Sequence, residues 1–478
     1  MLKSRTIVKG AALIGAVLTG VLMLDWNGLL STFGLRHAES ADNPNVSLRR
    51  LSPGILSIAL ESGWASAAGL TLQKDGTIVV GATTRVPASD KNLGVVLRLT
   101  SNGRLANPAV TLLVDAETIV SGISTALDGA IMVVGYGASG SLSATRHFRL
   151  ARLLPDGVLD PAFGRHGMTW ANMRSSLIWW LSDAAHALAL QGDGRIVVTG
   201  SAVYPLGPLS QAAYCATARF NQDGRLDGSF ADKGRVLTLL PGKTSCGGIA
   251  VFVAPDGGLI VAGNAYAEGV RGARSIAVLR YLPSGAPDPH FGRDGVAELE
   301  MAAHAQGAAL DSQGRIVVVG TEASRRLFVT RFDSHGNVDQ SFGVRGTVSL
   351  HDASVPQGLR AVALQQDGKI VAVGTVGWHS SGRAPEPGKR DQIVVVRVDP
   401  NGALDQSFAG GGLLLMASPR YLWGGHGIAI QPDGKLLIVG HTVEEAENGT
   451  LSRSAVVLVR LRPDGTPDLD FGSGVDTP

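Results

Sequence analysis

Short runs of apolar, β-branched residues recur along the whole chain. Residues 195–200 (Arg-Ile-Val-Val-Thr-Gly), 315–320 (Arg-Ile-Val-Val-Val-Gly) and 393–397 (Ile-Val-Val-Val-Arg) are examples. Runs of this length and chemistry are typical of β-strands that are covered on both faces. No stretch interrupts the series with a convincing 3.6-residue period, so the pattern predicts an all-β protein.

A turn signal stands between neighbouring runs. In most cases it is Asp-Gly or Asn-Gly, which suits tight hairpin turns because glycine accepts a positive φ. The turns come in pairs, and each pair predicts two hairpins. The first turn glycines are Gly76, Gly129, Gly194, Gly257, Gly314, Gly368 and Gly434. The second turn glycines are Gly103, Gly157, Gly224, Gly285, Gly336, Gly402 and Gly465.

The paired turns define seven copies of one repeat of about 60 residues. Four strands in each copy predict a seven-bladed β-propeller of four-stranded blades. The last copy ends without the final strand that the other copies have. Residues 54–60 offer a spare strand, and we expect them to complete the last blade and close the ring, which hides edges that an open array would expose.

A charged and aromatic framework recurs with the turns. An arginine occupies the same place in every copy, and an aspartate follows eight residues later in six of them, as in Arg152/Asp160, Arg219/Asp227 and Arg460/Asp468. These residues would lie nearly opposite each other in the hairpin, which predicts a structural cross-strand ion pair. The alternative is a ring of charges that binds a ligand. A phenylalanine that also recurs in six copies, such as Phe471, is interpreted as a core plug between blades.

The repeat resembles the delta-60 repeat family of bacterial β-propeller proteins. The resemblance rests on Leu-Gln-x-Asp-Gly-Lys-Ile-Val-x-x-Gly followed by Arg-x-x-x-x-Gly-x-Leu-Asp-x-x-Phe-Gly, and it covers residues 54–475. The first copy departs from this pattern. Its residues 105–108 (Leu-Ala-Asn-Pro) lack the aspartate, and the phenylalanine is also missing. The resemblance implies the fold and export, and it implies no common activity.

The first 40 residues differ from the repeats. Lys3, Arg5 and Lys9 precede an apolar run at residues 10–24, which predicts a signal peptide or an uncleaved N-terminal membrane anchor in residues 1–40. Residues 41–53 are expected to be a linker, and residues 54–478 the propeller. The protein is therefore expected to be periplasmic or secreted, or anchored in the inner membrane with the propeller outside the cytoplasm.

Only two cysteines are present, Cys215 and Cys246. They fall at strand starts in neighbouring repeats. In an oxidising compartment they would pair and tie two blades together. The alternative is two buried free thiols.

Composition excludes several classes of function. The net charge is +2, 17% of residues are charged, and acids and bases are interleaved, so no nucleic-acid partner is expected. Residues 135–140 (Gly-Tyr-Gly-Ala-Ser-Gly) match a dinucleotide motif, but they lead into a strand where that motif needs a helix. No zincin, serine-hydrolase, Cys-x-x-Cys or calcium-loop motif is present, so we assign no catalytic residue, metal or cofactor.

Candidate ligand-binding residues lie where the copies differ. Trp179, Trp180, Trp378 and Trp423 fall on variable connections, where tryptophan is a favoured anchor. The alternative is that these rings cover the ends of the blades. His186, Arg360 and His426 each stand eight residues before a first turn glycine. They predict a polar cluster at the channel mouth that binds an anion or polar ligand, and the alternative is strand-end capping.

The function that these patterns favour is an exported binding scaffold with its ligand face on the variable-loop side. We expect a monomer that binds a protein, peptide or glycan and touches a membrane only through an uncleaved N-terminal segment. The alternative is a periplasmic hydrolase or lyase with its site at the channel mouth. The absence of a visible acid–base or nucleophile constellation favours the binding scaffold.

Overall fold

The computed structural model describes most of the chain after residue 45. The described residues are 46–60, 62–86, 91–113, 117–138, 146–173, 182–205, 211–267, 274–350, 356–377, 391–418, 421–445 and 451–475. The predicted signal or anchor segment and the candidate anchors Trp179, Trp180 and Trp378 lie outside them. Within these ranges, no helix is long and apolar enough to cross a membrane.

The described residues form 29 strands, nearly all joined by antiparallel hairpins. Four sheets have four strands each. They are β3 (Ala65–Leu72), β4 (Ile78–Val86), β5 (Lys91–Leu99) and β6 (Leu105–Leu113); β7 (Ile119–Thr125), β8 (Ile131–Ala138), β9 (Arg146–Leu153) and β10 (Met168–Ala171); β19 (Ala303–Leu310), β20 (Ile316–Glu322), β21 (Leu327–Phe332) and β22 (Thr347–Leu350); β23 (Pro356–Leu364), β24 (Ile370–Val376), β25 (Gln392–Val398) and β26 (Leu413–Met416).

Two sheets are larger. A five-stranded sheet contains β1 (Val46–Ser52), β2 (Ile55–Leu60), β29 (Leu451–Leu461), β28 (Leu436–Glu445) and β27 (Tyr421–Ile430). An eight-stranded sheet contains β11 (Asp183–Leu190), β12 (Ile196–Pro205), β13 (Gln211–Phe220), β14 (Arg235–Thr238), β15 (Ser245–Val253), β16 (Leu259–Tyr266), β17 (Arg274–Tyr281) and β18 (Val296–Glu300).

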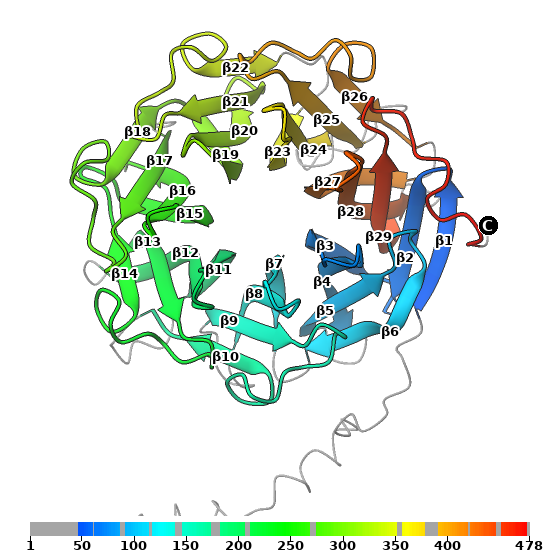
Figure 1. Ribbon diagram of the computed structural model, residues 1–478, viewed down its shortest axis with the longest axis horizontal. Coiled ribbons are helices and arrows are strands. Elements are labelled where there is room, and N and C mark those ends of the chain that lie inside the picture. Colours follow the sequence, from blue (N-terminus) through cyan, green and yellow to red (C-terminus); the bar gives the residue numbers. More distant parts are fainter. Residues whose placement is uncertain are drawn as a thin grey trace, which may run out of the picture. The chain divides into compact units, whose positions relative to one another are not determined.

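The sheets stand around a central axis as a β-propeller (Figure 1). The innermost strands are β3, β7, β11, β15, β19, β23 and β27, and each contacts the next. Because β27 also contacts β3, the series closes into a ring. The inner strands therefore enclose a central channel.

The prediction of seven separate four-stranded blades is wrong. Five sheets have the size of a single blade, four with four strands and one with five, and the remaining sheet has eight. The eight-stranded sheet arises because β13 and β15 pair in parallel at Ala213 and Ser245, which merges β11–β14 with β15–β18. Repeats in the sequence therefore do not correspond one to one with hydrogen-bonded sheets.

The predicted closing strand is confirmed. Strand β2 pairs antiparallel with β29, with Ile55 opposite Val459 and Ile58 opposite Val456. The fully buried Leu56 of β2 packs in one cluster with Phe471 from the C-terminal end of the chain. Residues more than 400 positions apart in the sequence thus form one sheet, which joins the two ends of the repeat array.

The predicted linker over residues 41–53 is wrong for residues 46–52, which form β1. This strand pairs with β2, from Val46 opposite Leu60 to Ser52 opposite Ile55. Val46 and Leu48 pack against the core, whereas Ser47 and Arg49 are exposed. This alternation is the period-2 pattern of a strand with one buried face, and it was present in the sequence.

The recurring phenylalanines lie under the second turn of the following repeat. Phe163, Phe230, Phe291, Phe342, Phe408 and Phe471 are all fully buried. A Cβ on Gly285 would lie 2.8 Å from the Phe230 ring, and a Cβ on Gly103 would lie 2.8 Å from the Phe471 ring. Each of these turns therefore needs a glycine for close approach of the ring as well as for its positive φ.

The recurring arginines hold their own repeat and the next one. In each pair the arginine Nε contacts the aspartate Oδ2, at 3.0 Å for Arg152–Asp160, 2.7 Å for Arg219–Asp227 and 2.7 Å for Arg460–Asp468. Many of these arginines also donate to a backbone carbonyl in the following repeat: Arg98 to Pro155 (3.0 Å), Arg219 to Pro283 (2.6 Å), Arg331 to Pro400 (2.6 Å), Arg397 to Pro463, and Arg460 to Ser101 (2.5 Å). These contacts agree with the predicted structural ion pair, and they occupy the charges that the alternative would offer to a ligand.

Asp227 and Asp339 remain ionised in the fold. Burial raises the pKa of Asp227 and Asp339, but hydrogen bonds from the serine two residues later and from the paired arginine outweigh it. The pKa of both carboxyl groups is therefore held below its usual value. Arg219 and Arg331 also stack over Phe230 and Phe342, each 4.5 Å from the ring centroid.

We predict that Arg331→Met destabilises the protein by about 2 kcal/mol, because it leaves Asp339 as a partly buried charge without its cation. The side chain of Arg331 is only 4% exposed. Urea denaturation measures the effect, and Arg293→Met is the matched control, because Arg293 is exposed. Equal midpoints for the two variants would contradict the role of the pair.

We also predict loss of stability in acid. A carboxyl group whose pKa is depressed by folding contributes stability above its unfolded pKa, and this contribution disappears as the pH falls through the folded value. The carboxyl groups should therefore make the thermal midpoint fall steeply below about pH 4, and the buried histidines, whose pKa is also depressed in the fold, should start the decline below about pH 6.5. Calorimetry across this range tests the sign, and a midpoint that rises on acidification would show that these carboxyl groups do not stabilise the fold.

Candidate functional site

Every innermost strand is interrupted at the same place. In each one the register with its neighbour shifts and leaves one residue unpaired, as in a β-bulge. The bulged residues are Ala68, Ser121, His186, Ile249, Gln306, Arg360 and His426. These are the positions eight residues before each first turn glycine, so the predicted cluster of His186, Arg360 and His426 corresponds to bulges.

All the bulged residues line one cavity of about 770 Å³ along the channel axis. Its wall also includes Ser201, Ala213 and Tyr266, which lie toward the ends of β12 and β16 and the start of β13. These positions lie on the side of the variable connections, so the cavity extends from the bulges toward that face. A cavity of this volume is in the range of small-molecule sites.

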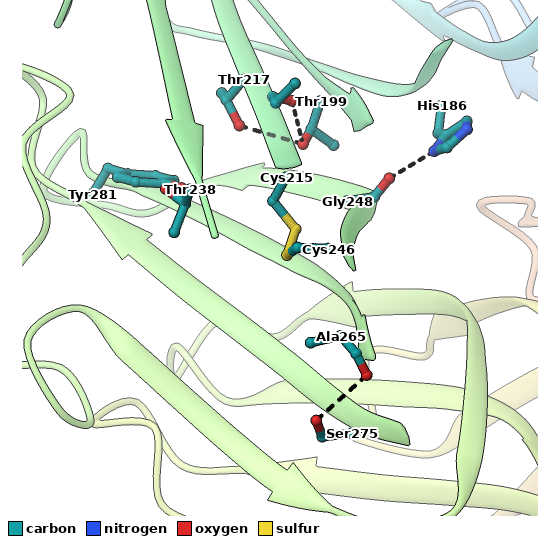
Figure 2. Close-up of a disulfide and its surroundings, with 11 residues drawn as sticks. His186, Thr199, Cys215, Thr217, Thr238, Cys246, Gly248, Ala265, Ser275 and Tyr281 are labelled. Atoms are coloured by element: carbon teal, nitrogen blue, oxygen red, sulfur yellow. Dashed lines mark hydrogen bonds between the residues drawn. A yellow bond between two sulfur atoms is a disulfide. The ribbon is translucent and has the colours of Figure 1, made fainter. Parts of the chain in front are cut away.

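Some polar residues of the inner wall bond to the next inner strand. Ser121 Oγ donates to the carbonyl of Ala185 (2.6 Å). His186 Nδ1 donates to the carbonyl of Gly248 (2.8 Å; Figure 2). Since a carbonyl only accepts, this bond places the proton of neutral His186 on Nδ1. Burial lowers the pKa of His186. Strand-to-strand bonding therefore accounts for these two side chains.

Arg360 has no such bond. Its Nε is buried and has no hydrogen-bond partner among the described residues. Burial lowers the pKa of Arg360, and the charge of nearby Asp391 opposes this effect. A guanidinium stays charged in proteins, so Arg360 brings a positive charge to the wall. Among the described residues that line the cavity, it is the only arginine, and no lysine, aspartate or glutamate lines it.

His426 pairs with a second imidazole beside Arg360. His426 Nε2 lies 2.7 Å from His441 Nδ1, and the ring centroids are 4.8 Å apart. Burial, the neighbouring His441 and the charge of Arg360 together hold the pKa of His426 well below 6.5. Burial and Arg360 lower the pKa of His441 to about 4, against an opposing effect of Asp391. Both rings are therefore neutral at pH 7.

A second hydrogen-bonded pair lines another part of the wall. Tyr266 Oη and His304 Nδ1 are 2.9 Å apart, on β16 and β19. Burial raises the pKa of Tyr266, while burial and the charge of Arg274 lower the pKa of His304. The exposed Arg274 lies over the Tyr266 ring, 5.6 Å from its centroid. Both members of the pair are neutral at pH 7.

The structure corrects the prediction that Trp423 is a ligand anchor. Trp423 is 5% exposed and packs in a core cluster with Val373, Ile393 and Phe408. Its position in β27 places the ring between neighbouring sheets, where a large apolar group gains most from burial. Trp423 therefore fits the alternative interpretation, in which the tryptophan ring packs against the blades.

Cys215 and Cys246 are joined by a disulfide that links β13 to β15 (Figure 2). Both residues are buried, and Cys246 belongs to the cavity wall. The bond lies beside the parallel pair Ala213–Ser245 that merges two repeats into the eight-stranded sheet. It therefore ties neighbouring repeats together next to the cavity.

Several residues in the cavity wall or directly behind it were not found from the sequence. Gln306 shares the eight-residue offset with Arg360 and could have been found by it. His441 directly follows the glycine that ends a repeated apolar run, and its register opposite Gly424 places it beside His426. Tyr266 and His304 occupy positions that vary among the copies, and no sequence signal marked them.

Four segments of the chain match the model of a family described as a domain of unknown function (DUF5122) β-propeller. They are residues 127–163, 191–230, 254–291 and 431–471. Each segment ends at a recurring phenylalanine, and together they contain four of the six arginine–aspartate pairs. His186, Arg360 and His426 lie outside all four segments, so the match concerns the scaffold.

Comparison with solved structures shows weak likeness to other proteins. An unknown-function protein of Dyadobacter fermentans is 10% identical over 88% of this chain and 100% of that chain, with a TM-score of 0.41. An α-L-arabinanase of Penicillium chrysogenum is 12% identical over 72% and 93% (TM-score 0.40). A gluconolactonase of Xanthomonas campestris is 12% identical over 89% and 99% (TM-score 0.34). No curated protein matches the chain.

We predict that His441 titrates near pH 4, and His426 well below 6.5, in an NMR titration of the imidazole resonances. Arg360→Gln should raise both pKa values, because it removes a positive charge that disfavours protonation. A wild-type His426 that titrates at or above pH 6.5, or pKa values unchanged by Arg360→Gln, would contradict this arrangement.

Proposed function

We propose that the protein is an exported binding propeller that holds a small anion in its central channel. Arg360 supplies the charge that anchors the anion. The observation that carries the proposal is the buried Arg360 Nε, which has no partner among the described residues and belongs to a cavity wall without a described carboxylate. A buried donor without a partner is costly unless a ligand satisfies it.

Comparison within the inner wall supports this role. Ser121 and His186 use their polar atoms to bond the neighbouring strand, and so does Asn264, which makes two bonds with the backbone of Ala305. Arg360 occupies a bulge like Ser121 and His186 but makes no such bond to any residue in the described part of the chain. A bulge is a common device for aiming a side chain into a site. A structural role therefore accounts for the polar atoms of Ser121, His186 and Asn264, but it does not account for the guanidinium of Arg360.

The histidine pair adds hydrogen-bonding capacity beside the charge. His426 and His441 each use one ring nitrogen to bond the other, so each keeps a second nitrogen. An anion bound at Arg360 would offset the positive charge that lowers both pKa values. Binding should therefore favour proton uptake by this pair and strengthen as the pH falls toward 5.

Export is the second part of the proposal. It is supported by the basic and apolar N-terminal segment and by the disulfide, since disulfides persist in oxidising compartments. The ligand would enter from the variable-connection side, toward which the cavity extends. Binding of a protein, peptide or glycan by Trp179, Trp180 or Trp378 stays a prediction, because these residues lie outside the described ranges.

A hydrolase or lyase at the channel mouth is the competing function. The Tyr266–His304 pair is the observation in its favour, because a tyrosine and a histidine can exchange a proton with a substrate. Against it, the described wall offers no carboxylate, and His186 uses Nδ1 to bond a backbone carbonyl. Chemical change of a bound ligand, followed by NMR, would favour the enzyme.

We predict that the protein binds phosphate or acetate and that Arg360→Gln weakens this binding about 10- to 100-fold, as expected for loss of a charge-assisted hydrogen bond. Isothermal titration calorimetry at pH 6 measures it. Arg326→Gln is the matched control, because Arg326 is exposed and lies outside the cavity wall. Equal affinities of the wild type and Arg360→Gln, or no binding of either anion, would refute the proposal.

A further inference from the structure

The cavity wall carries two chemically different groups of side chains, a charged end and an uncharged end. Arg360 on β23 provides a charge, whereas Tyr266 and His304 provide an uncharged hydrogen-bonded pair and an aromatic ring. Among the described residues, the Tyr266 hydroxyl makes one hydrogen bond, which joins it to His304. A tyrosine hydroxyl can donate one hydrogen bond and accept two, so this group keeps capacity for a ligand.

The two ends lie on neighbouring parts of the wall. His304 and Gln306 are both on β19, and β19 packs against β23, which carries Arg360. A Cβ on Gly307 would lie 2.6 Å from the Arg360 carbonyl oxygen, so the two strands approach closely at this point. Gln306 lies on β19 beside β23; its buried Oε1 lies over Gly358 of β23 and has no hydrogen-bond partner among the described residues, while its amide nitrogen can still donate to a ligand. One small molecule can therefore face all of these side chains.

The charge states of Tyr266 and His304 determine which kind of ligand group this pair would bind. Tyr266 is protonated and His304 is neutral at pH 7, because burial disfavours the charged form of each. Uncharged donors and acceptors suit hydroxyl groups, whereas an ionised group is better matched by a guanidinium.

We propose that Tyr266 and His304 form a second recognition point, so that the channel ligand is a hydroxylated carboxylate, with an acidic sugar as its simplest form. The inference rests on the proposed anion site, because Arg360 holds the carboxylate. Tyr266, His304 and Gln306 then bind hydroxyl groups of the same molecule. The cavity of about 770 Å³ has room for a ligand of this class.

The test compares D-glucuronate, acetate and D-glucose by calorimetry on the wild type and on Tyr266→Phe. We expect glucuronate to bind at least about tenfold more tightly than acetate, and glucose to bind more weakly than glucuronate. Tyr266→Phe removes only a hydroxyl, and it should weaken glucuronate about fivefold while acetate is unchanged. His304→Ala should give a loss in the same direction. Tyr136→Phe is the control, since Tyr136 is outside the cavity wall.

The outcomes separate the two proposals. If glucuronate binds no more tightly than acetate, and acetate binding still needs Arg360, the second recognition point is refuted and the anion site stands. If Tyr266→Phe and His304→Ala both leave the preference for glucuronate unchanged, these residues do not provide it. If no anion binds, both proposals fail.

Discussion

The ring depends on one recurring interaction, the arginine that joins its own hairpin to the following repeat. In Arg219, Arg331 and Arg460 the Nε atom pairs with an aspartate of the same hairpin, while another guanidinium nitrogen reaches a backbone carbonyl of the next repeat. The bond from Arg460 to Ser101 joins the last repeat to the first. Because both partners are largely buried, removal of either leaves an uncompensated charge. The same contact therefore fixes each hairpin and sets the position of its neighbour.

That rigid frame allows the inner strands to differ from regular strands. Each inner strand carries its bulge at the same level, and small residues follow the bulges because neighbouring backbones approach closely there. A Cβ on Gly427, for example, would lie 3.1 Å from the Cα of Gly69. The bulge brings one side chain of each strand to the channel, and its identity is free to vary. Alanine and isoleucine occupy two of these positions, whereas Arg360 and His426 bring charge and hydrogen bonding to one sector of the wall.

The sequence predicted what recurs and missed what depends on contacts between repeats. The turn glycines, the strands, the arginine–aspartate pairs and the closure by residues 54–60 all followed from repetition. The parallel pair Ala213–Ser245 did not, because no local pattern specifies how two sheets meet. The offset of His186, Arg360 and His426 was visible in the sequence. It did not show that His186 bonds the next strand while Arg360 Nε has no partner among the described residues. Tyr266 and His304 meet only in the folded ring, since each stands at a position that no other copy repeats.

The proposed binding site requires that Arg360 anchors a carboxylate inside the channel. A crystal structure of the protein with D-glucuronate bound would show where the ligand sits. We expect the carboxylate on the guanidinium of Arg360 and the sugar hydroxyls on Tyr266 and His304. A ligand seated on the outer connections, with Arg360 not in contact with it, would contradict the claim.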